Sequence, residues 1–343
     1  MRTIDNKQKV KRYLKKIGFH NVTDIKFQRN RNFLVFFKKG NTSFLLKQRG
    51  QDNTVFNTIS LENEILFLQN LKDDISLSKK IFLPKIYKTD SVNELFISKK
   101  YESYKTVSSF KINQKLFSDL GKHIASFHRI KNRELTHTLP IIKKETFFHN
   151  LNIFRPEVLT NGGPNILTYI KCIQKYPDVL ENLYKLSESY EYNAFIHGDL
   201  KFDNILARKA KQYHIKFIDF EFTTVGDKHY DLGYILGNLL FDWIIKMNLK
   251  KQKTDYKEQY FNTVIHCFKS CIRTYEEQTK SIVNMELTLK YAGFYLLKIF
   301  FNCSMDNRTL NKTHFMFVQV ARNYIVHTDK QLKSFTYDQQ YAS

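Results

Sequence analysis

The fold is decided by the stretch Phe195-Ile196-His197-Gly198-Asp199-Leu200-Lys201-Phe202-Asp203-Asn204-Ile205-Leu206. It contains the pattern H-x-D-x-x-x-x-N, in which Asn204 follows Asp199 by five residues. The segment Phe217-Ile218-Asp219-Phe220-Glu221 then has the pattern of a strand that ends in an acid, and Asp219 lies twenty residues after Asp199. Phosphoryl transfer uses one carboxylate to orient a hydroxyl, and an amide and a second carboxylate to hold Mg²⁺. The spacing therefore predicts a site for phosphoryl transfer.

Three side chains of this stretch have predicted roles. Asp199 is the candidate catalytic carboxylate, because it would accept a hydrogen bond from the acceptor hydroxyl and aim that group at the γ-phosphoryl. Asn204 and Asp219 are the candidate Mg²⁺ ligands, because hard oxygen donors suit that ion. Two short strands, predicted over residues 205–207 and 215–218, would hold both ligands on one rigid hairpin.

Composition predicts a packed globular protein. The chain has 343 residues, of which 42% are hydrophobic and 15% aromatic, which is enough for two lobes with a core each. The net charge of +22 admits two interpretations, an acidic partner or merely a lysine-rich composition. Either way, such a basic surface is a poor match for a polycationic substrate.

The cysteines and the apolar runs predict a cytoplasmic location. Cys172, Cys267, Cys271 and Cys303 form no C-x-x-C pair, which fits a reducing compartment. The first residues contain no apolar run of a secretory signal, and no segment approaches the ~18 apolar residues of a membrane span.

The first hundred residues favour a strand-rich lobe. Val10, Tyr13, Leu14 and Ile17 recur with the spacing of an amphipathic helix. Strand patterns follow over residues 22–28, 33–38 and 43–48. A helical pattern then spans residues 58–71, and a hairpin pattern spans residues 83–99.

Nucleotide-binding residues are expected in the same lobe. Lys47 ends the third strand, where a kinase holds the cation that pairs with the α- and β-phosphates. Residues 99–102 would form the hinge at which the chain meets adenine, and we expect Lys99 and Tyr101 to contribute to nucleotide binding there.

After residue 100 the pattern is mostly helical. Within one helix, Gly121 and Ala125 lie four residues apart and would let another helix approach closely. Beyond Gly233, helical patterns span residues 234–247, 256–277, 285–302 and 311–327. The predicted organisation is an α+β fold with an N-terminal lobe over residues 1–100, a helical C-terminal lobe over residues 101–330 and a polar tail over residues 331–343.

The chain resembles the aminoglycoside phosphotransferase and choline kinase group of the protein-kinase-like superfamily. The matching pieces occur in the family's order; they are Lys47, Glu64, Leu120–His128, His197–Asn204, Ile218–Glu221 and Gly226-Asp227-x-x-Tyr230-Asp231-Leu232-Gly233. The resemblance implies a bilobal protein-kinase-like fold, with a small antiparallel-sheet lobe and a larger helical lobe. It also implies an enzyme that uses ATP and Mg²⁺ to phosphorylate an alcohol group.

The resemblance assigns further roles and shows two departures. Glu64 would keep Lys47 in position, with Glu62 as the competing acid, and Asp231 would hydrogen-bond the catalytic loop. The connection over residues 29–32 holds no glycine, unlike the glycine-rich loop of protein kinases, and Glu221 replaces the glycine of D-F-G.

The acceptor is less well specified. Lys201 follows Asp199 as D-x-K, the protein-kinase form, in which the lysine would reach the transferred phosphoryl as a second catalytic group. With the helices before the motif, it suggests a resemblance to phosphotransferase-like partners in thioamitide and class V lanthipeptide biosynthesis. That branch implies that the acceptor is a Ser or Thr of a ribosomally made, acidic precursor peptide. It also implies a lyase-like partner protein.

Two alternatives remain open. The first is a small-molecule kinase acting on an aminoglycoside, choline or sugar hydroxyl. The second is a catalytically weak, kinase-like module that binds nucleic acid or an acidic peptide. The intact set of Lys47, Asp199, Asn204 and Asp219 argues against the second, and nucleic acid is an unlikely partner.

Overall fold

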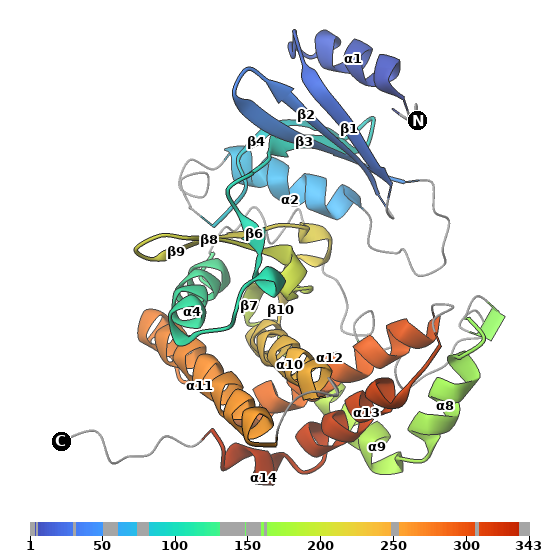
Figure 1. Cartoon of the computed structure of the whole chain (residues 1–343), viewed down its shortest axis with the longest axis vertical. Coiled ribbons are helices and arrows are strands. Elements are labelled where there is room, and N and C mark those ends of the chain that lie inside the picture. The colour runs from blue at the N-terminus through green and yellow to red at the C-terminus, as the bar shows by residue number, and fades with distance from the viewer. Residues whose placement is uncertain are drawn as a thin grey trace.

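A computed structural model of the chain describes residue 4, residues 6–29, 32–50, 61–73, 82–130, residue 148, residues 159–160, 163–247, 254–305 and 309–335. Figure 1 shows a small lobe built on a sheet at one end of the molecule and a larger helical lobe at the other. The predicted α+β architecture with two unequal lobes is therefore confirmed.

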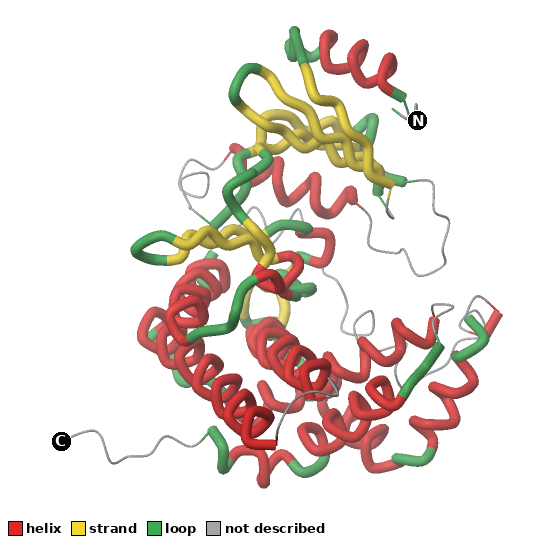
Figure 2. Tube along the Cα trace, viewed as in Figure 1, coloured by secondary structure: helices red, strands yellow, loops and turns green. Residues whose placement is uncertain are grey.

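The small lobe is built on one antiparallel sheet with the strand order β1-β2-β3-β5-β4. Its strands run as expected from the sequence, and all five are drawn together in Figure 2. Their bounds are β1 (Thr23–Arg29), β2 (Phe33–Lys39), β3 (Thr42–Gln48), β4 (Ile86–Asp90) and β5 (Leu95–Lys99).

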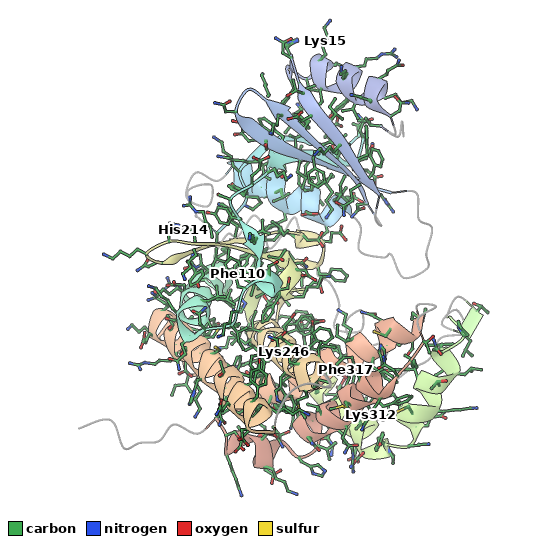
Figure 3. All side chains as sticks on the ribbon, viewed as in Figure 1. Lys15, Phe110, His214, Lys246, Lys312 and Phe317 are labelled. Atoms are coloured by element: carbon green, nitrogen blue, oxygen red, sulfur yellow. The ribbon has the colours of Figure 1, made fainter. Side chains whose placement is uncertain are left out.

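The two faces of this sheet bury different partners. On the outer face, Val35, Phe37 and Leu46 pack with Val10 and Leu14 of α1 (Lys7–Lys16), so the predicted amphipathic helix is present and its apolar side is covered. The polar side of α1 is exposed, and Figure 3 shows Lys15 projecting away from the lobe. The inner face is covered by α2 (Leu61–Asp73), which contacts β4 and β5.

Small sheets lie between the lobes. Strand β6 (Lys105–Thr106) pairs with the β8–β9 hairpin (Ile205–Lys209 and Tyr213–Phe217), and β7 (Ala194–Ile196) pairs with β10 (Thr224–Gly226). Short 3₁₀ turns occur at η1 (Val107–Ser109), η2 (Phe202–Asn204) and η3 (Phe220–Phe222). The predicted hairpin is therefore present. Strand β8 begins directly after Asn204, and β9 ends two residues before Asp219.

The large lobe is a bundle in which α4 packs on α11 and α12 packs on both α10 and α13. Helices α8 and α9 lie against α12 and α13 at its outer end (Figure 1). Within the described ranges no helix combines the length and apolarity needed to cross a membrane. The bounds are α4 (Gln114–His128), α8 (Ile166–Gln174), α9 (Pro177–Glu188), α10 (Lys228–Met247), α11 (Thr254–Thr279), α12 (Met285–Met305), α13 (Lys312–Ile325) and α14 (Thr328–Leu332).

Helix α10 begins six residues before the predicted start at Tyr234, because it starts at Lys228. The Asp227 carboxylate accepts the N–H of His229 at 2.9 Å, as an N-cap side chain does. The sequence pattern predicts the start of this helix only after the matched motif that ends at Gly233.

The end of the described chain differs from the expected polar tail over residues 331–343. The predicted helix over residues 311–327 is α13, and the short helix α14 follows it. Phe335, inside the predicted polar tail, is buried, and its ring centroid lies 5.8 Å from that of Phe268. Residues 336–343 of that tail lie outside the described residues.

Gly121 is predicted to be indispensable for the contact between α4 and α11. A Cβ atom there would lie 2.2 Å from the Cys271 carbonyl oxygen, so a side chain would push the helices apart. We expect Gly121→Val to lower the free energy of unfolding by about 3 kcal/mol in urea denaturation. Lys115→Val, at an exposed position of the same helix, is the control and should lose only about 0.5 kcal/mol. Equal losses in the two variants would contradict the close packing.

Candidate active site

Lys47 is the centre of a buried cluster of charges between the lobes. It lies on β3 opposite Leu34 and Phe96 of the neighbouring strands, and its side chain is 9% exposed. Its Nζ atom lies 2.6 Å from Glu64 Oε2 and 2.9 Å from Glu221 Oε1. It also forms an ion pair with Asp219. One ammonium group therefore joins β3, α2 and the segment after β9.

Burial and charge act in opposite directions on this cluster. Burial alone would lower the pKa of Lys47, but Glu64 and the two other carboxylates outweigh it and raise that pKa above its ordinary value. Burial raises the pKa of Glu64 above its usual range, although Lys47 works against this shift. Of the two candidate acids on α2, Glu64 is the one that pairs with Lys47, whereas Glu62 is exposed.

Asp219 is held by its backbone and by the ring that follows it. Its φ of 68° and ψ of 62° lie in the left-handed region, which is uncommon for a residue with a side chain. The Phe220 ring is fully buried, with centroids 4.8 Å from Phe67 and 5.1 Å from His197. Burial would raise the pKa of Asp219, but Lys47 outweighs it and holds that pKa below the usual value. Asp219 is therefore kept ionised at the lobe boundary.

Helix α2 fixes the same segment through its polar side chains. Glu64 Oε1 accepts the N–H of Phe220 at 3.1 Å. The Asn63 amide donates to the carbonyl oxygens of Glu221 and Thr223, at 2.9 Å each. Our sequence analysis missed Asn63, since an asparagine beside the candidate glutamate carries no pattern of its own.

The catalytic loop is supported from behind by Asp231 of α10. Its carboxylate accepts the backbone N–H of His197 at 2.7 Å and that of Gly198 at 3.0 Å. Gly198 has a φ of 74°, and a Cβ atom there would lie 2.4 Å from the Phe222 carbonyl oxygen, so only glycine fits this turn. The loop shape therefore depends on a buried carboxylate and on one glycine.

Asp199, Lys201 and Asn204 come together at the end of this loop. The Asn204 amide donates to the carbonyl oxygen of Asp199 at 2.8 Å and to its carboxylate at 3.0 Å. Lys201 Nζ lies 2.8 Å from the same carboxylate. The side chain of Asp199 is 13% exposed and that of Lys201 is 40% exposed, so both can be reached from outside.

Asn204 also lies beside the strand end that carries Asp219, because its carbonyl oxygen accepts the N–H of Ile218 at 3.0 Å. Carboxylate oxygens of Glu64, Asp219 and Glu221 lie within 4.8 Å of one another. These hard oxygen donors fit a cation such as Mg²⁺. Glu64 is only 2% exposed and also accepts a backbone N–H, whereas the side chain of Asp219 is 36% exposed, so Asp219, with Asn204 beside it, is the better candidate for a metal ligand.

The side chains of Lys99 and Tyr101 do not join this cluster. Lys99 is exposed at the end of β5. The Tyr101 hydroxyl accepts the N–H of Lys85 at 3.0 Å, and the Lys216 ammonium lies 4.4 Å from its ring centroid. The nucleotide contact expected at these positions stays a prediction.

Glu221 is the residue whose involvement the sequence left undecided. Its carboxylate pairs with Lys47 and accepts a hydrogen bond from the Asn32 amide, next to the glycine-free β1–β2 connection. The sequence shows an acid two residues after Asp219, but which groups its carboxylate meets depends on the fold. Residues 30 and 31 of that connection lie outside the described residues.

Comparisons with known proteins show similarity to phosphotransferases over the middle of the chain. Residues 99–260 match the phosphotransferase enzyme family. A protein LicA homolog of Metamycoplasma hominis is 26% identical over 175 residues, which are 49% of this chain and 59% of that protein. A second LicA homolog, from Mycoplasma capricolum, is 31% identical over 20% of this chain and 26% of that protein. The chain thus aligns with less than two thirds of the length of these curated relatives.

Solved structures share the fold over nearly the whole chain. Choline kinase LicA from Streptococcus pneumoniae superposes with a TM-score of 0.53 at 15% identity, covering 93% of this chain and 98% of that one. Plasmodium vivax ethanolamine kinase superposes with a TM-score of 0.53 at 17% identity, covering 97% of this chain and 91% of that one. A spectinomycin phosphotransferase in complex with ADP and spectinomycin superposes with a TM-score of 0.53 at 13% identity, covering 94% of this chain and 98% of that one. The predicted family resemblance is confirmed, whereas the narrower peptide-tailoring branch gains no support.

Removing the Lys47 charge should destabilise the protein in a pH-dependent way. In Lys47→Met, Glu64 and Glu221 stay buried without their cation, so the pKa of Glu64 in the folded state rises further above its unfolded value. The folded state then binds more protons than the unfolded state, and stability falls as the pH rises through that pKa. We expect a loss of about 3–5 kcal/mol at pH 8 and a smaller loss at pH 5, measured by urea denaturation.

Lys26→Met is the matched control for this experiment, because Lys26 is exposed on β1 of the same sheet. It should change stability by no more than about 0.5 kcal/mol at either pH. A Lys47→Met variant that is destabilised equally at both pH values would contradict the charge balance described here.

Proposed function

Because residues 99–260 form a domain of the phosphotransferase enzyme family, we propose that the chain is an ATP-dependent kinase whose acceptor is a hydroxyl group of a small molecule. The observation that carries this proposal is the pairing of Lys47 with Glu64 and Asp219, next to a loop that joins Asp199 to Asn204. These groups match the electrostatic parts that phosphoryl transfer needs, in their required order along the chain.

In this proposal the residues have separate tasks. Asp199 accepts the hydrogen bond of the acceptor hydroxyl, orients its oxygen and takes up its proton. That oxygen bonds to the γ-phosphorus while the bond from this phosphorus to the bridging oxygen breaks, and ADP leaves with the bonding electrons. Lys201, which already lies 2.8 Å from Asp199, would neutralise the transferred phosphoryl.

Lys47 has a second task on the nucleotide side. In the structure it pairs with Asp219 as well as Glu64, so nucleotide binding would exchange the Asp219 contact for phosphate oxygens. Asp219 and Asn204 would then hold Mg²⁺, which supplies positive charge to the phosphates when it is bound. Glu64 keeps the Lys47 ammonium in place during this exchange.

The class of acceptor rests on the relatives. The similar proteins named above are a choline kinase, an ethanolamine kinase and a spectinomycin phosphotransferase, all named for small molecules that carry hydroxyl groups. They favour a small molecule over the Ser or Thr of a precursor peptide. Lys201 does not favour a peptide over a small molecule, because its ion pair with Asp199 is compatible with either acceptor. The peptide acceptor and its lyase-like partner stay predictions without support.

Asp199→Asn should remove catalysis and leave nucleotide binding nearly unchanged. Loss of one positioned electrostatic group costs on the order of 10²–10³ in kcat. We would measure ADP release with an accepted alcohol and ATP affinity by calorimetry. Asp329→Asn, an exposed carboxylate on α14, is the control. Unchanged turnover in Asp199→Asn would contradict its assignment as the catalytic carboxylate.

Asp219→Ala should weaken the Mg²⁺-dependent part of ATP binding. Losing an outer partner of a metal ligand costs about 10- to 100-fold in metal affinity, so losing the ligand itself should cost at least as much. The measurement compares ATP affinity with Mg²⁺ and with EDTA for both proteins. If Mg²⁺ strengthens ATP binding to Asp219→Ala as much as to the original chain, the metal assignment is wrong.

A further inference from the structure

Lys298 of α12 is a cation held between aromatic rings. Its Nζ atom donates to the Tyr234 hydroxyl at 2.7 Å. The same atom lies 5.2 Å from the centroid of the Tyr234 ring and 5.6 Å from that of the Phe222 ring. Both distances are within the range of a cation–π contact. In the described part of the chain, no carboxylate forms an ion pair with Lys298.

This cation lies beside the catalytic loop. Phe222 touches the loop, since a Cβ atom on Gly198 would lie 2.4 Å from the Phe222 carbonyl oxygen. The pKa of Lys298 is lowered by burial, while the nearby charge of Asp199 raises it and that of Lys201 lowers it. Lys298 is thus within electrostatic reach of the catalytic carboxylate.

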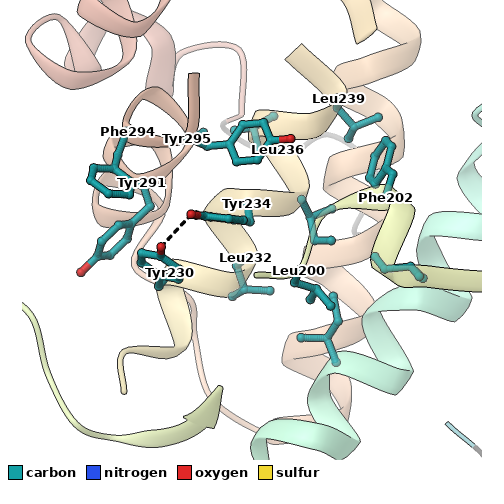
Figure 4. Packing of buried hydrophobic residues seen from close by; sticks show 14 of the residues in the cluster. Leu200, Phe202, Tyr230, Leu232, Tyr234, Leu236, Leu239, Tyr291, Phe294 and Tyr295 are labelled. Atoms are coloured by element: carbon teal, nitrogen blue, oxygen red, sulfur yellow. Dashed lines mark hydrogen bonds between the residues drawn. The ribbon is translucent and has the colours of Figure 1, made fainter. Parts of the chain in front are cut away.

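The rings of Phe222, Tyr234 and Tyr295 lie together beside the loop, and we call them the aromatic wall. The Tyr295 hydroxyl of α12 donates to the side-chain amide oxygen of Asn238 at 3.0 Å, and that oxygen also accepts the N–H of Phe202, three residues after Asp199. Figure 4 shows Tyr234 next to Tyr295, and a dashed line marks the hydrogen bond between the Tyr234 and Tyr230 hydroxyls. The aromatic wall is therefore tied to the loop through Asn238, and Lys298 adds a positive charge to it.

An aromatic wall of this kind is what a cationic ligand such as a quaternary ammonium needs. Here the ammonium of Lys298 already occupies the faces of two rings. A cationic acceptor would have to displace it or lie beside it, and like charges at close range oppose binding. Lys201 adds a second ammonium group next to Asp199.

The nearby carboxylates have other partners, and Asp199 is paired with Lys201. The Glu221 carboxylate is engaged by Lys47 and Asn32. Asp203 is exposed, and its carboxylate accepts a hydrogen bond from the Ser108 hydroxyl at 2.6 Å. Lys298 itself is half-buried, so part of its surface can meet a ligand.

We propose that Lys298 selects an acceptor alcohol that carries an anionic group, a carboxylate or a phosphate, and disfavours cationic amino alcohols. The proposal deepens the kinase function proposed above and rests on it. It gives Lys298 a role in acceptor specificity, through an ion pair with the acceptor, and it differs from what the names of the relatives suggest for their own acceptors.

The test uses acceptors of one length and three charges. The full chain with ATP and Mg²⁺ is assayed for ADP release with 3-hydroxypropanoate, propane-1,3-diol and 3-aminopropan-1-ol, and also with glycerol 1-phosphate and choline. Binding of the same compounds is measured by calorimetry on protein saturated with a non-hydrolysable ATP analogue. The anionic probes should exceed the cationic ones by about tenfold or more in kcat/KM or in affinity.

Variants of Lys298 should reverse this preference. Lys298→Met should abolish the advantage of the anionic probes, and Lys298→Glu should favour 3-aminopropan-1-ol and choline. Lys290→Met is the matched control, because Lys290 lies two turns earlier on the same helix and pairs with Glu286 at 2.6 Å. It should keep the preference of the original chain. If Lys298→Glu does not fold, Lys298→Met alone still decides the question.

Two outcomes would overturn the proposal. One is that choline or 3-aminopropan-1-ol is bound or phosphorylated as well as the anionic probes, or that no probe binds. The other is that the Lys298 variants keep the preference of the original chain. The kinase function is judged separately, by slow ATP hydrolysis without acceptor and its loss in Asp199→Asn. Hydrolysis that persists while the anionic preference is missing refutes only the role of Lys298.

Discussion

One buried positive charge organises the junction of the two lobes. The Lys47 ammonium is nearly inaccessible to water and is balanced by Glu64, Asp219 and Glu221. Removing a buried charge from water is costly unless partners surround it, so the three segments that supply these groups must meet at one point. The orientation of α2, the position of the sheet and the path of the chain after β9 all follow from that requirement.

Aromatic packing beneath the charges makes the arrangement rigid. Phe220 follows Asp219 directly and is enclosed by Phe67 from α2, Phe127 from α4 and His197 from the catalytic loop. Such rings bury large apolar areas, and that burial ties the segment of Asp219 to both lobes. The Asp231 carboxylate provides the polar counterpart by fixing the loop backbone from α10. Catalysis by positioned charges depends on this kind of preorganisation.

Several features were predictable because they follow from local patterns. The strand alternation on both sides of Lys47, the helical spacing of α4 and the H-x-D-x-x-x-x-N pattern each express a rule that acts within a few residues. Other features were not predictable, because they depend on distant partners. The early start of α10 needed the Asp227 cap, and the burial of Phe335 needed α11. The Tyr101 ring contacts Lys216, a partner more than a hundred residues away along the chain.

The sequence by itself determined the class of chemistry, since Lys47, Asp199, Asn204 and Asp219 are residue types at spacings that only a limited set of reactions requires. It also determined two lobes, through the change from strand periodicity to helical periodicity. Only the tertiary structure decided which acid pairs with Lys47 and where Glu221 points. It alone brought Lys298 to the aromatic rings beside the loop of Asp199, about a hundred residues away along the chain. The physical reason is that charge pairing and cation–π contacts act through space, and sequence separation carries no information about such distances.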